Sequence, residues 1–260
     1  MKKDVIIVNN FYENPEEVIR YAMSLKYYNP WARNQMGSSA PEDMVNTATR
    51  VSFFKKAKEC PFKSSKEFIG ALEKITGEEI DLDHWNKDFP ENPEDGTELQ
   101  NRFDLIDPNK KTTFDNLVPN AVSCRWNCVF QVKHIRHQKN ELIHNHVRDT
   151  WNSVGLSGWT GLIYLNKDAP RDAGLATYKN IKGDHYEWMS APENWELVDD
   201  YANVYNRLIL LRGLVPHVGA AGWGNTLKNG RLYQTLFFKT KPTEDLADGF
   251  TFRPNPTIEK

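Results

Sequence analysis

Two histidines and an aspartate stand close together in the run His144-Asn145-His146-Val147-Arg148-Asp149. Side chains of an extended strand alternate between its two faces, so His144 and His146 can point toward the same site. A third histidine, His217, follows Pro216 far downstream. If the fold brings His217 alongside, the chain holds the parts of a site of two histidines and one carboxylate, which binds Fe(II) on one side and leaves the other side open.

Three combinations of ligands from the first motif are open: His144 with His146, His146 with Asp149, or His144 with Asp149. Strand alternation favours the two histidines, because Asp149 has the opposite parity unless the backbone is bulged. Metal chemistry favours the carboxylate, because a hard, charged oxygen ligand suits Fe(II). We therefore predict that His146, Asp149 and His217 bind the metal. His144 is predicted to be a further ligand or to donate a hydrogen bond to one of the ligands.

An arginine shares a strand face with aromatic residues in the C-terminal part of the chain. In the expected strand over 231–239, Arg231 alternates onto the same face as Thr235, and Tyr164 lies in the expected strand over 159–165. A buried guanidinium needs an anion, and its fork of donors suits a carboxylate. This pattern indicates a pocket for a small dicarboxylic acid, although an arginine on a solvent-facing strand would pair with a surface acid instead.

Composition sets the broad class of the protein. The chain has 260 residues, of which 39% are hydrophobic, enough for the core of one compact domain. Its net charge of -2 gives no reason to expect a nucleic-acid or membrane partner. No apolar run is long enough for a signal peptide or a membrane span, so we expect a cytoplasmic protein. Cys60, Cys124 and Cys128 match no disulfide or zinc pattern and are expected to be reduced core residues.

The first part of the chain is predicted to be helical and irregular. A strand is expected at 4–8, followed by a helix that begins at Asn14-Pro15-Glu16-Glu17 and ends near residue 25. A second helix is expected over 64–76, because Gly77 provides a stop signal. We assign no regular structure to 81–120.

From residue 121 onward the chain has short apolar or alternating runs separated by turn residues. A short helix and loop are expected over 192–205, and strands are expected at 121–133, 142–147, 159–165, 175–178, 207–211 and 231–239. Such a series, without helices of crossover length, is typical of a jelly-roll or barrel. The fold class expected is mainly β with flanking helices (α+β).

These motifs, in this order and spacing, resemble the Fe(II)/2-oxoglutarate-dependent dioxygenase superfamily, in its prolyl-hydroxylase-like branch. The resemblance covers 131–239 closely, and the start of the chain, 5–18, is similar to the start of small bacterial and phage members. The elements that carry it are Ile143-His144-Asn145-His146, Gly161-Leu162-Ile163-Tyr164-Leu165-Asn166, Gly174-Leu175-Ala176-Thr177-Tyr178, Arg207-Leu208-Ile209-Leu210-Leu211, Pro216-His217 and Gly230-Arg231-Leu232-Tyr233-Gln234-Thr235.

The resemblance implies a double-stranded β-helix (jelly-roll) core over 121–260, with 1–120 as an N-terminal helical and irregular elaboration packed on it. It implies iron held by a histidine and a carboxylate on one strand and by His217. Arg231 and Tyr164 would bind the distal carboxylate of 2-oxoglutarate, with Thr235 nearby. The family expects His-x-Asp or His-x-Glu, whereas this chain has a second histidine at the third position of that motif.

The activity implied is hydroxylation of an unactivated C–H bond with Fe(II), O2 and 2-oxoglutarate, which is converted to succinate. The substrate, a small molecule or a peptide, and the oligomeric state are not encoded in any motif. Two alternatives remain: a halogenase of the same superfamily, which lacks the carboxylate ligand, and a non-catalytic jelly-roll that binds a small molecule or glycan. A buried Arg231 separates the enzyme from the binding module, which has no need of it.

Overall fold

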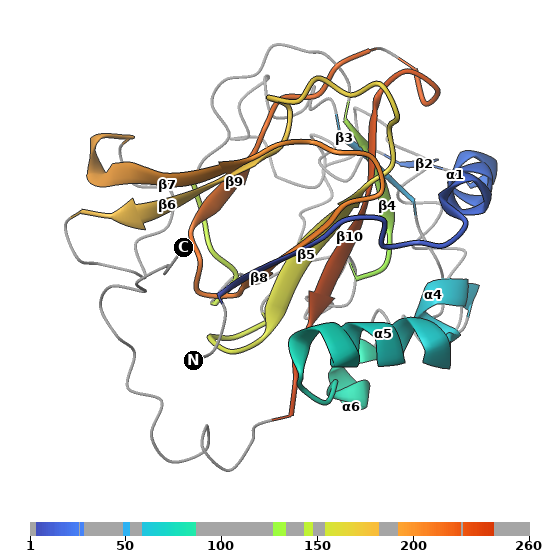
Figure 1. Ribbon diagram of the computed structural model, residues 1–260, viewed down its shortest axis with the longest axis horizontal. Coiled ribbons are helices and arrows are strands. Elements are labelled where there is room, and N and C mark those ends of the chain that lie inside the picture. The colour runs from blue at the N-terminus through green and yellow to red at the C-terminus, as the bar shows by residue number, and fades with distance from the viewer. Residues whose placement is uncertain are drawn as a thin grey trace, which may run out of the picture.

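The strands of the protein form two antiparallel sheets, and helices lie beside the larger one (Figure 1). The computed structural model describes residues 4–25, 27–28, 49–52, 59–86, 127–133, 143–147, 154–181, 192–224 and 226–241. Within these ranges no helix is long and apolar enough to cross a membrane.

The larger sheet has seven strands in the order β1-β8-β5-β10-β4-β3-β2, and every neighbouring pair is antiparallel. In that order the strands are Val5–Val8, Leu208–Arg212, Trp159–Tyr164, Arg231–Phe238, Phe130–Lys133, Thr49–Ser52 and Tyr27–Tyr28. The long central strand β10 lies between β5 and β4. Residues from three distant parts of the chain therefore lie side by side on each face of the sheet.

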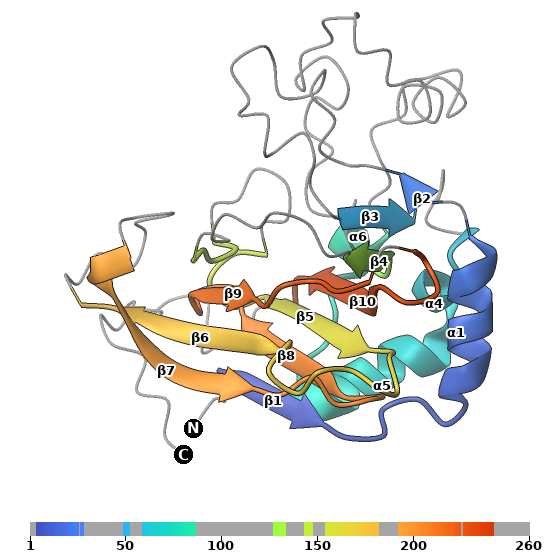
Figure 2. The ribbon, with the colours of Figure 1, turned by 90° about the horizontal axis from the view of Figure 1, so that it is seen from above.

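The smaller sheet has the order β7-β6-β9, with β7 at Trp195–Tyr201, β6 at Leu175–Asn180 and β9 at His217–Gly219. An isolated antiparallel bridge between His144 and His217 places a fourth chain segment beside β9. Figures 1 and 2 both show the larger sheet between this smaller sheet and the helices.

The chain passes back and forth between the two sheets. It runs from β4 in the larger sheet to residue 144 beside the smaller sheet, then to β5, to β6 and β7, to β8, to β9 and finally to β10. Eight segments arranged in this way, four in each sheet, form a double-stranded β-helix. The predicted jelly-roll fold is thus confirmed.

Four helices precede β4 in the described residues. They are α1 (Pro15–Ser24), α4 (Pro61–Ser64), α5 (Lys66–Thr76) and α6 (Leu82–Trp85). The predicted helix over 64–76 is confirmed as α5, and it begins at Lys66 because the Ser65 side chain caps it by accepting a hydrogen bond from Phe68 N. Gly77 ends α5 with a φ of 72°, as its position predicted.

Two hydrophobic clusters lie on the two faces of the larger sheet. The first joins α1, α5 and α6 to the sheet and includes Ala22, Leu72 and Trp85. The second lies between the sheets and includes Tyr164 and Tyr233. Because the helices share their core with the strands, and β1 pairs with β8, the N-terminal segment stabilises the same body that carries the β-helix.

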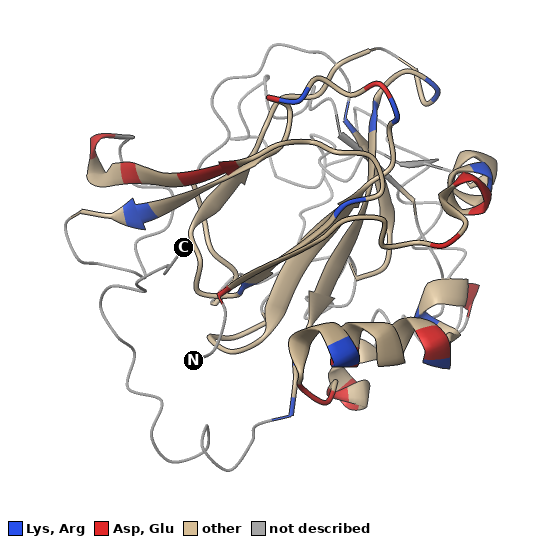
Figure 3. Cartoon of the chain, viewed as in Figure 1, with Lys and Arg blue, Asp and Glu red and all other residues tan. Residues whose placement is uncertain are grey.

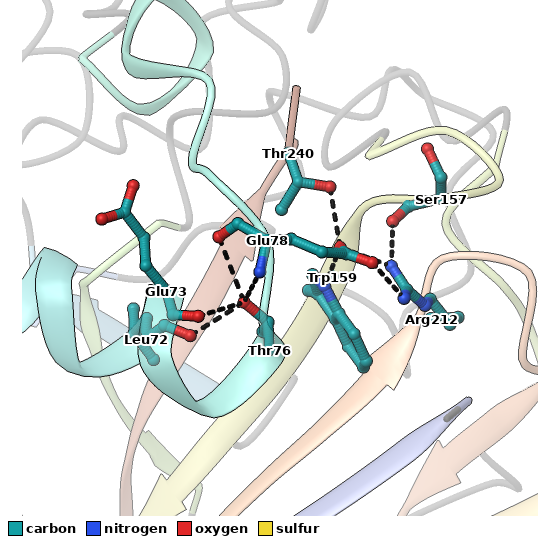
Figure 4. A network of polar contacts seen from close by, with 8 residues as sticks. All are labelled: Leu72, Glu73, Thr76, Glu78, Ser157, Trp159, Arg212 and Thr240. Carbon is teal, nitrogen blue, oxygen red and sulfur yellow. Dashed lines mark hydrogen bonds and ion pairs between the residues drawn. The ribbon is translucent and has the colours of Figure 1, made fainter. Parts of the chain in front are cut away.

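A buried ion pair connects the segment after α5 to one end of the larger sheet, where Trp159 and Arg212 are paired (Figure 4). The Glu78 carboxylate accepts hydrogen bonds from Arg212 Nη1 at 2.8 Å and Trp159 Nε1 at 3.0 Å, and from Thr240 Oγ1 at 2.9 Å. Arg212 also donates to Ser157 O at 2.6 Å, and its guanidinium lies 3.9 Å from the Trp159 ring centroid. Most donors and acceptors of this pair are therefore satisfied inside the protein.

The prediction of a helix and loop over 192–205 is wrong. Only a 3₁₀ turn at Pro192–Asn194 is helical, and β7 follows it directly. β7 is the edge strand of the smaller sheet and carries acidic residues (Figure 3), of which Glu196 and Asp200 are exposed. Charged residues on an edge strand prevent pairing with another chain. They also hide the apolar alternation by which a strand is recognised in a sequence.

The prediction of reduced core cysteines is confirmed for Cys60 and Cys128, which are free and buried. Cys124 lies outside the described residues. Burial raises the pKa of both thiols, so they stay protonated in the core.

Candidate metal centre

Three histidines come together at one end of the space between the sheets. His144 N donates to His217 O at 3.1 Å, and His217 N donates to His144 O at 2.8 Å, so a backbone bridge fixes these two residues opposite each other. His146 N donates to Gly213 O at 2.8 Å, in the turn between β8 and β9. One nitrogen from each of the three imidazoles lies within 4.8 Å of the others.

The spacing of the imidazoles fits a shared metal ion. Two imidazole nitrogens that each bind one ion at about 2.0–2.1 Å lie at most about 4.2 Å apart. The ring centroids of His144, His146 and His217 are 4.8–5.1 Å apart, so small side-chain rotations bring all three nitrogens to one ion. Imidazole is a good ligand for iron, zinc, copper and nickel, so the donors alone leave the metal's identity to other features.

His217 is held in the tautomer that a metal ligand requires. Its Nδ1 lies 2.9 Å from Val215 O, and because a carbonyl oxygen only accepts, Nδ1 carries the proton. The Nε2 lone pair is then free to bind a metal. Burial, together with the neighbouring His144 and His146, lowers the pKa of His217 well below its usual value. The ring is therefore neutral at neutral pH, as a ligand must be.

Asp149, one of the predicted ligands, lies outside the described residues and stays a prediction. The chain turns just before it, because Asn145 Oδ1 accepts a hydrogen bond from Val147 N at 3.1 Å. Strand alternation ends at such a turn, so the parity argument against Asp149 does not apply beyond His146. His144 joins His146 and His217 in the cluster. The strand predicted over 142–147 is not formed in the described residues 143–147, where only an isolated bridge at His144 precedes the bend.

Gly213 is a part of the site that the sequence gave no reason to select. A Cβ atom at this position would lie 2.1 Å from Gly155 O and 2.7 Å from Val154 Cγ2. Only glycine therefore allows the turn to approach the segment that follows the histidine motif, where Val154 N donates to His146 O at 2.9 Å. On its other side His146 packs edge-to-face against Phe237, with ring centroids 5.0 Å apart.

Arg231 is buried at the start of β10, with 1% of its surface exposed. Its Nη1 donates to Ala220 O at 2.7 Å and its Nη2 to Gly174 O at 2.8 Å. Its Nε has no hydrogen-bond partner, and no acid within the described ranges forms an ion pair with it. A guanidinium has five N–H groups, so donors remain for an anion.

Tyr164 lies beside this guanidinium. The Arg231 guanidinium carbon is 5.7 Å from its ring centroid and 4.9 Å from that of Tyr233, the residue opposite Tyr164 in the register of β5 and β10. The Tyr164 hydroxyl is buried without a hydrogen-bond partner. Burial raises its pKa, although the charge of Arg231 opposes the shift, so the hydroxyl stays a donor. An unmet donor beside an unmet cation indicates a site for an anion.

Thr235 lies further along the same face of β10, where its hydroxyl donates to Val129 O at 3.3 Å. The face also carries Gln131, whose Nε2 donates to Thr235 Oγ1 at 3.4 Å and whose Oε1 accepts from Tyr233 OH at 3.0 Å. Gln131 is a second residue that the sequence did not single out. Its role depends on the β4–β10 register, which places it opposite Tyr233.

A short stretch of chain connects the candidate anion site at Arg231 and Tyr164 to the metal centre. Ala220, whose carbonyl accepts from Arg231, comes three residues after His217, which corresponds to about 10 Å of extended chain at about 3.3 Å per residue. A short dicarboxylate can bridge such a span, with one end at the metal and the other at the guanidinium.

Comparison with known proteins gives only distant likenesses. No protein-family model and no curated protein matches the chain. Among solved structures, it is similar to a prolyl hydroxylase from Trichoplax adhaerens in complex with a hypoxia inducible factor peptide (14% identity, TM-score 0.40, 91% of this chain and 83% of that chain covered). It is also similar to a prolyl-4-hydroxylase from Pseudomonas putida (10% identity, TM-score 0.40, 92% of this chain and 94% of that chain covered).

A further similar structure is the non-heme alpha ketoglutarate dependent epimerase SnoN from nogalamycin biosynthesis (10% identity, TM-score 0.47, 98% of this chain and 88% of that chain covered). With such low identities and TM-scores, these likenesses do not assign a function. The function must follow from the residues of this chain.

Proposed function

We propose that this protein is an Fe(II)/2-oxoglutarate-dependent oxygenase that hydroxylates an unactivated C–H bond. The observation that supports this most is the buried Arg231, which has unused donors next to a cluster of three histidines. A metal centre alone is compatible with many reactions, and an anion pocket alone with simple binding. Here both sites are close enough for one small dicarboxylate to bind to both, which favours a 2-oxo acid as a cosubstrate that binds the metal.

In this proposal the protein positions the reactants and the metal performs the oxidation. His144, His146 and His217 hold Fe(II) on one side, while Arg231 and Tyr164 bind the distal carboxylate of 2-oxoglutarate. Bound iron supplies the activation of O2 that couples decarboxylation of 2-oxoglutarate to succinate with hydroxylation of the substrate. The hydrophobic residues between the sheets exclude water from the cosubstrate.

Charge favours an acidic cosubstrate. Three neutral imidazoles leave the full positive charge of the metal in a largely buried site, and Arg231 adds another cation. A dicarboxylate brings two negative charges, one to each cation. Asp149, if it reaches the metal, would neutralise part of the same charge. The proposed substrate is a small molecule or a peptide.

The test is spectroscopic. Anaerobic addition of Fe(II) and 2-oxoglutarate is expected to give a weak visible metal-to-ligand band. In Arg231→Ala the half-saturating 2-oxoglutarate concentration should rise by the equivalent of about 2–5 kcal/mol, because truncation removes one member of a buried charge pair. Mn(II) affinity, measured by calorimetry, should not change. No band with a folded, metal-loaded protein would favour a non-catalytic binding module.

Halogenation is the second candidate, because within the described ranges no carboxylate joins the histidine cluster. A halogenase needs a metal position for halide, which the loss of a carboxylate ligand provides. In this proposal the third imidazole of the cluster would take that position, which favours hydroxylation. Chloride should therefore change neither the visible band nor the product once a substrate is found, and a chlorinated product would reverse this assignment.

A further inference from the structure

One row of residues crosses the inner face of the smaller sheet, beginning at the metal centre. Thr177 of β6 lies opposite His217 of β9 and, on its other side, opposite Asp199 of β7. Residues directly opposite each other in an antiparallel sheet point to the same face. Because His217 points into the histidine cluster, Thr177 and Asp199 face the space between the sheets as well. Figure 2 shows the three strands side by side in the order β9, β6, β7.

The burial of β7 agrees with this orientation. Asp199 and Tyr201 are partly buried, whereas Asp200 between them is exposed. Tyr201 packs against the hydrophobic cluster between the sheets, and Asp199 is its neighbour on the same face of the strand. The bulge between β6 and β7 begins after the pair of Thr177 and Asp199, so it does not change the face on which Asp199 lies. Asp199 is therefore a carboxylate that points toward the site.

Asp199 has few partners for an inward-facing carboxylate. Its Oδ2 accepts a hydrogen bond from Tyr201 OH at 3.3 Å, and among the described residues no lysine or arginine forms an ion pair with it. Burial raises the pKa of Tyr201 to about 12, so this phenol is a neutral donor that does not compensate the charge of Asp199. A carboxylate has about four acceptor positions, so most of them remain for a ligand.

Two simpler roles do not account for Asp199. It is too far from the metal centre to be a ligand, because two strand spacings of about 4.8 Å separate it from His217. In agreement, the ligand cluster found within the described residues contains only histidines. Asp199 is also not needed to keep the edge of β7 from pairing with another chain, because Glu196 and Asp200 already provide exposed charges there.

We propose that Asp199 binds a cationic group of the substrate, an ammonium or a guanidinium, and so restricts the oxygenase to substrates with a positive charge. A carboxylate with unused acceptor positions forms charge-assisted hydrogen bonds with either group. The site lies about 10 Å across the sheet from His217, so the cation is several bonds away from the carbon that faces the metal. The substrate class rests on the proposed function, whereas the cation site itself rests on the register of the smaller sheet.

The experiment is calorimetric titration of the full-length protein, loaded with Mn(II) and 2-oxoglutarate under anaerobic conditions, with matched probes. The cationic probes are the amino acids lysine and arginine and pentapeptides that carry each of them between two pairs of glycines. In the neutral probes, norleucine and citrulline take their places. Broadening of the probe's proton NMR signals by Mn(II), with a Zn(II)-loaded sample as reference, shows whether a probe binds beside the metal.

Cationic probes should bind at least about 10-fold more tightly than their neutral counterparts, and Asp199→Asn should weaken only the cationic probes, by about 10–100-fold. Asp200→Asn is the matched control, because it removes the same charge from the adjacent, exposed position on the other face of β7. It should change neither set of affinities. Tyr201→Phe, which removes the neutral donor but keeps the carboxylate, should retain the preference for cations. Tighter binding of the peptides than of the free amino acids would identify a peptide as the source of the cation.

Each contrary result is decisive. Equal affinities for cationic and neutral probes, no binding of any cationic probe, or equal losses in Asp199→Asn and Asp200→Asn overturn the proposal and leave the proposed function standing. Loss of the cation preference in Tyr201→Phe would show that Asp199 acts only through Tyr201. If the protein does not bind 2-oxoglutarate, the proposed function fails, and the same titrations without 2-oxoglutarate still decide whether Asp199 binds cations. Should Asp199→Asn not fold, Asp199→Ser replaces it.

Discussion

The three histidines of the candidate metal centre are positioned by backbone hydrogen bonds, so each can be truncated with little loss of packing. His144 and His217 are paired through their main chains, and His146 N is bound by Gly213 O. Their imidazoles can therefore be tested as ligands separately from the fold. Asp149 can be tested in the same series as the one predicted ligand outside the described residues.

We expect alanine at His144, His146 or His217 to lower Mn(II) affinity by more than about 100-fold, because each removes a metal bond. Asp149→Ala should lower it by a similar factor if Asp149 binds the metal, as predicted, and by about 10–100-fold if Asp149 only supports the ligands. Isothermal titration measures the affinities, and circular dichroism checks the fold. Unchanged affinity in His217→Ala would rule out this site. If His144→Ala leaves the Mn(II) affinity unchanged and Asp149→Ala lowers it by more than about 100-fold, the ligands are His146, Asp149 and His217 instead.

At the scale of elements, the β8–β9 turn connects the two sheets and carries the main-chain acceptor for His146. Its position depends on close contact with the segment at 154–158, since Gly213 N donates to Gly158 O at 2.9 Å. The metal centre is thus sensitive to a residue that contributes no side chain to it.

Gly213→Ala is expected to destabilise the protein by about 1–3 kcal/mol, because the added methyl group overpacks the turn against Gly155 O. Mn(II) affinity should also fall by about 10–100-fold, because the shifted turn moves His146. Gly70→Ala in α5 is the matched control: no atom lies within 4 Å of its Cβ position, and alanine should stabilise the helix by about 0.5–1 kcal/mol. Urea unfolding and metal titration measure both effects. Full metal affinity in Gly213→Ala would show that the turn does not position the ligand.

At the scale of the whole molecule, the ion pair of Glu78 and Arg212 holds the helical layer to the β-helix (Figure 4). The Arg212 side chain is 5% exposed and the Glu78 side chain 6%. Burial alone would raise the pKa of Glu78, but the hydrogen bond and charge of Arg212 outweigh it, so the pKa is lowered. A carboxyl group with a lowered pKa in the folded state stabilises the protein above its unfolded-state pKa, and this contribution is lost as the pH falls through the folded-state value.

Glu78→Gln should lower the free energy of unfolding at pH 7 by about 3–5 kcal/mol, because it leaves the buried Arg212 charge uncompensated. The difference from wild type should shrink below about pH 4.5, where the wild-type carboxyl group loses its advantage. Urea unfolding between pH 3.5 and 7 measures this difference in the free energy of unfolding. The double variant Glu78→Met/Arg212→Met, which removes both charges, should recover much of the stability. A loss that is the same at every pH would show that the charge of Glu78 is not what stabilises the protein.

Local patterns in the sequence were sufficient for the β-rich fold and for most of the candidate site. Alternation along β10 put Arg231 with Thr235, because neighbouring side chains of a strand point to opposite faces whatever the strand pairs with. His144 and His146 meet although only an isolated bridge forms at His144. Pro15 located the start of α1, although the Asn14 side chain makes no cap hydrogen bond, and Gly77 located the end of α5. The type of each short element is decided within a few residues, and the sequence displays those residues directly.

Only the tertiary structure decided how these elements meet. The register of the smaller sheet puts Asp199 on the same face as His217, the close approach of two loops requires Gly213, and the edge position of β7 explains why so polar a segment is a strand. Each of these contacts joins residues far apart in the chain. Strand register and loop contacts depend on the packing of the whole core, and the periodicity of side chains along one strand does not determine which strands become its neighbours.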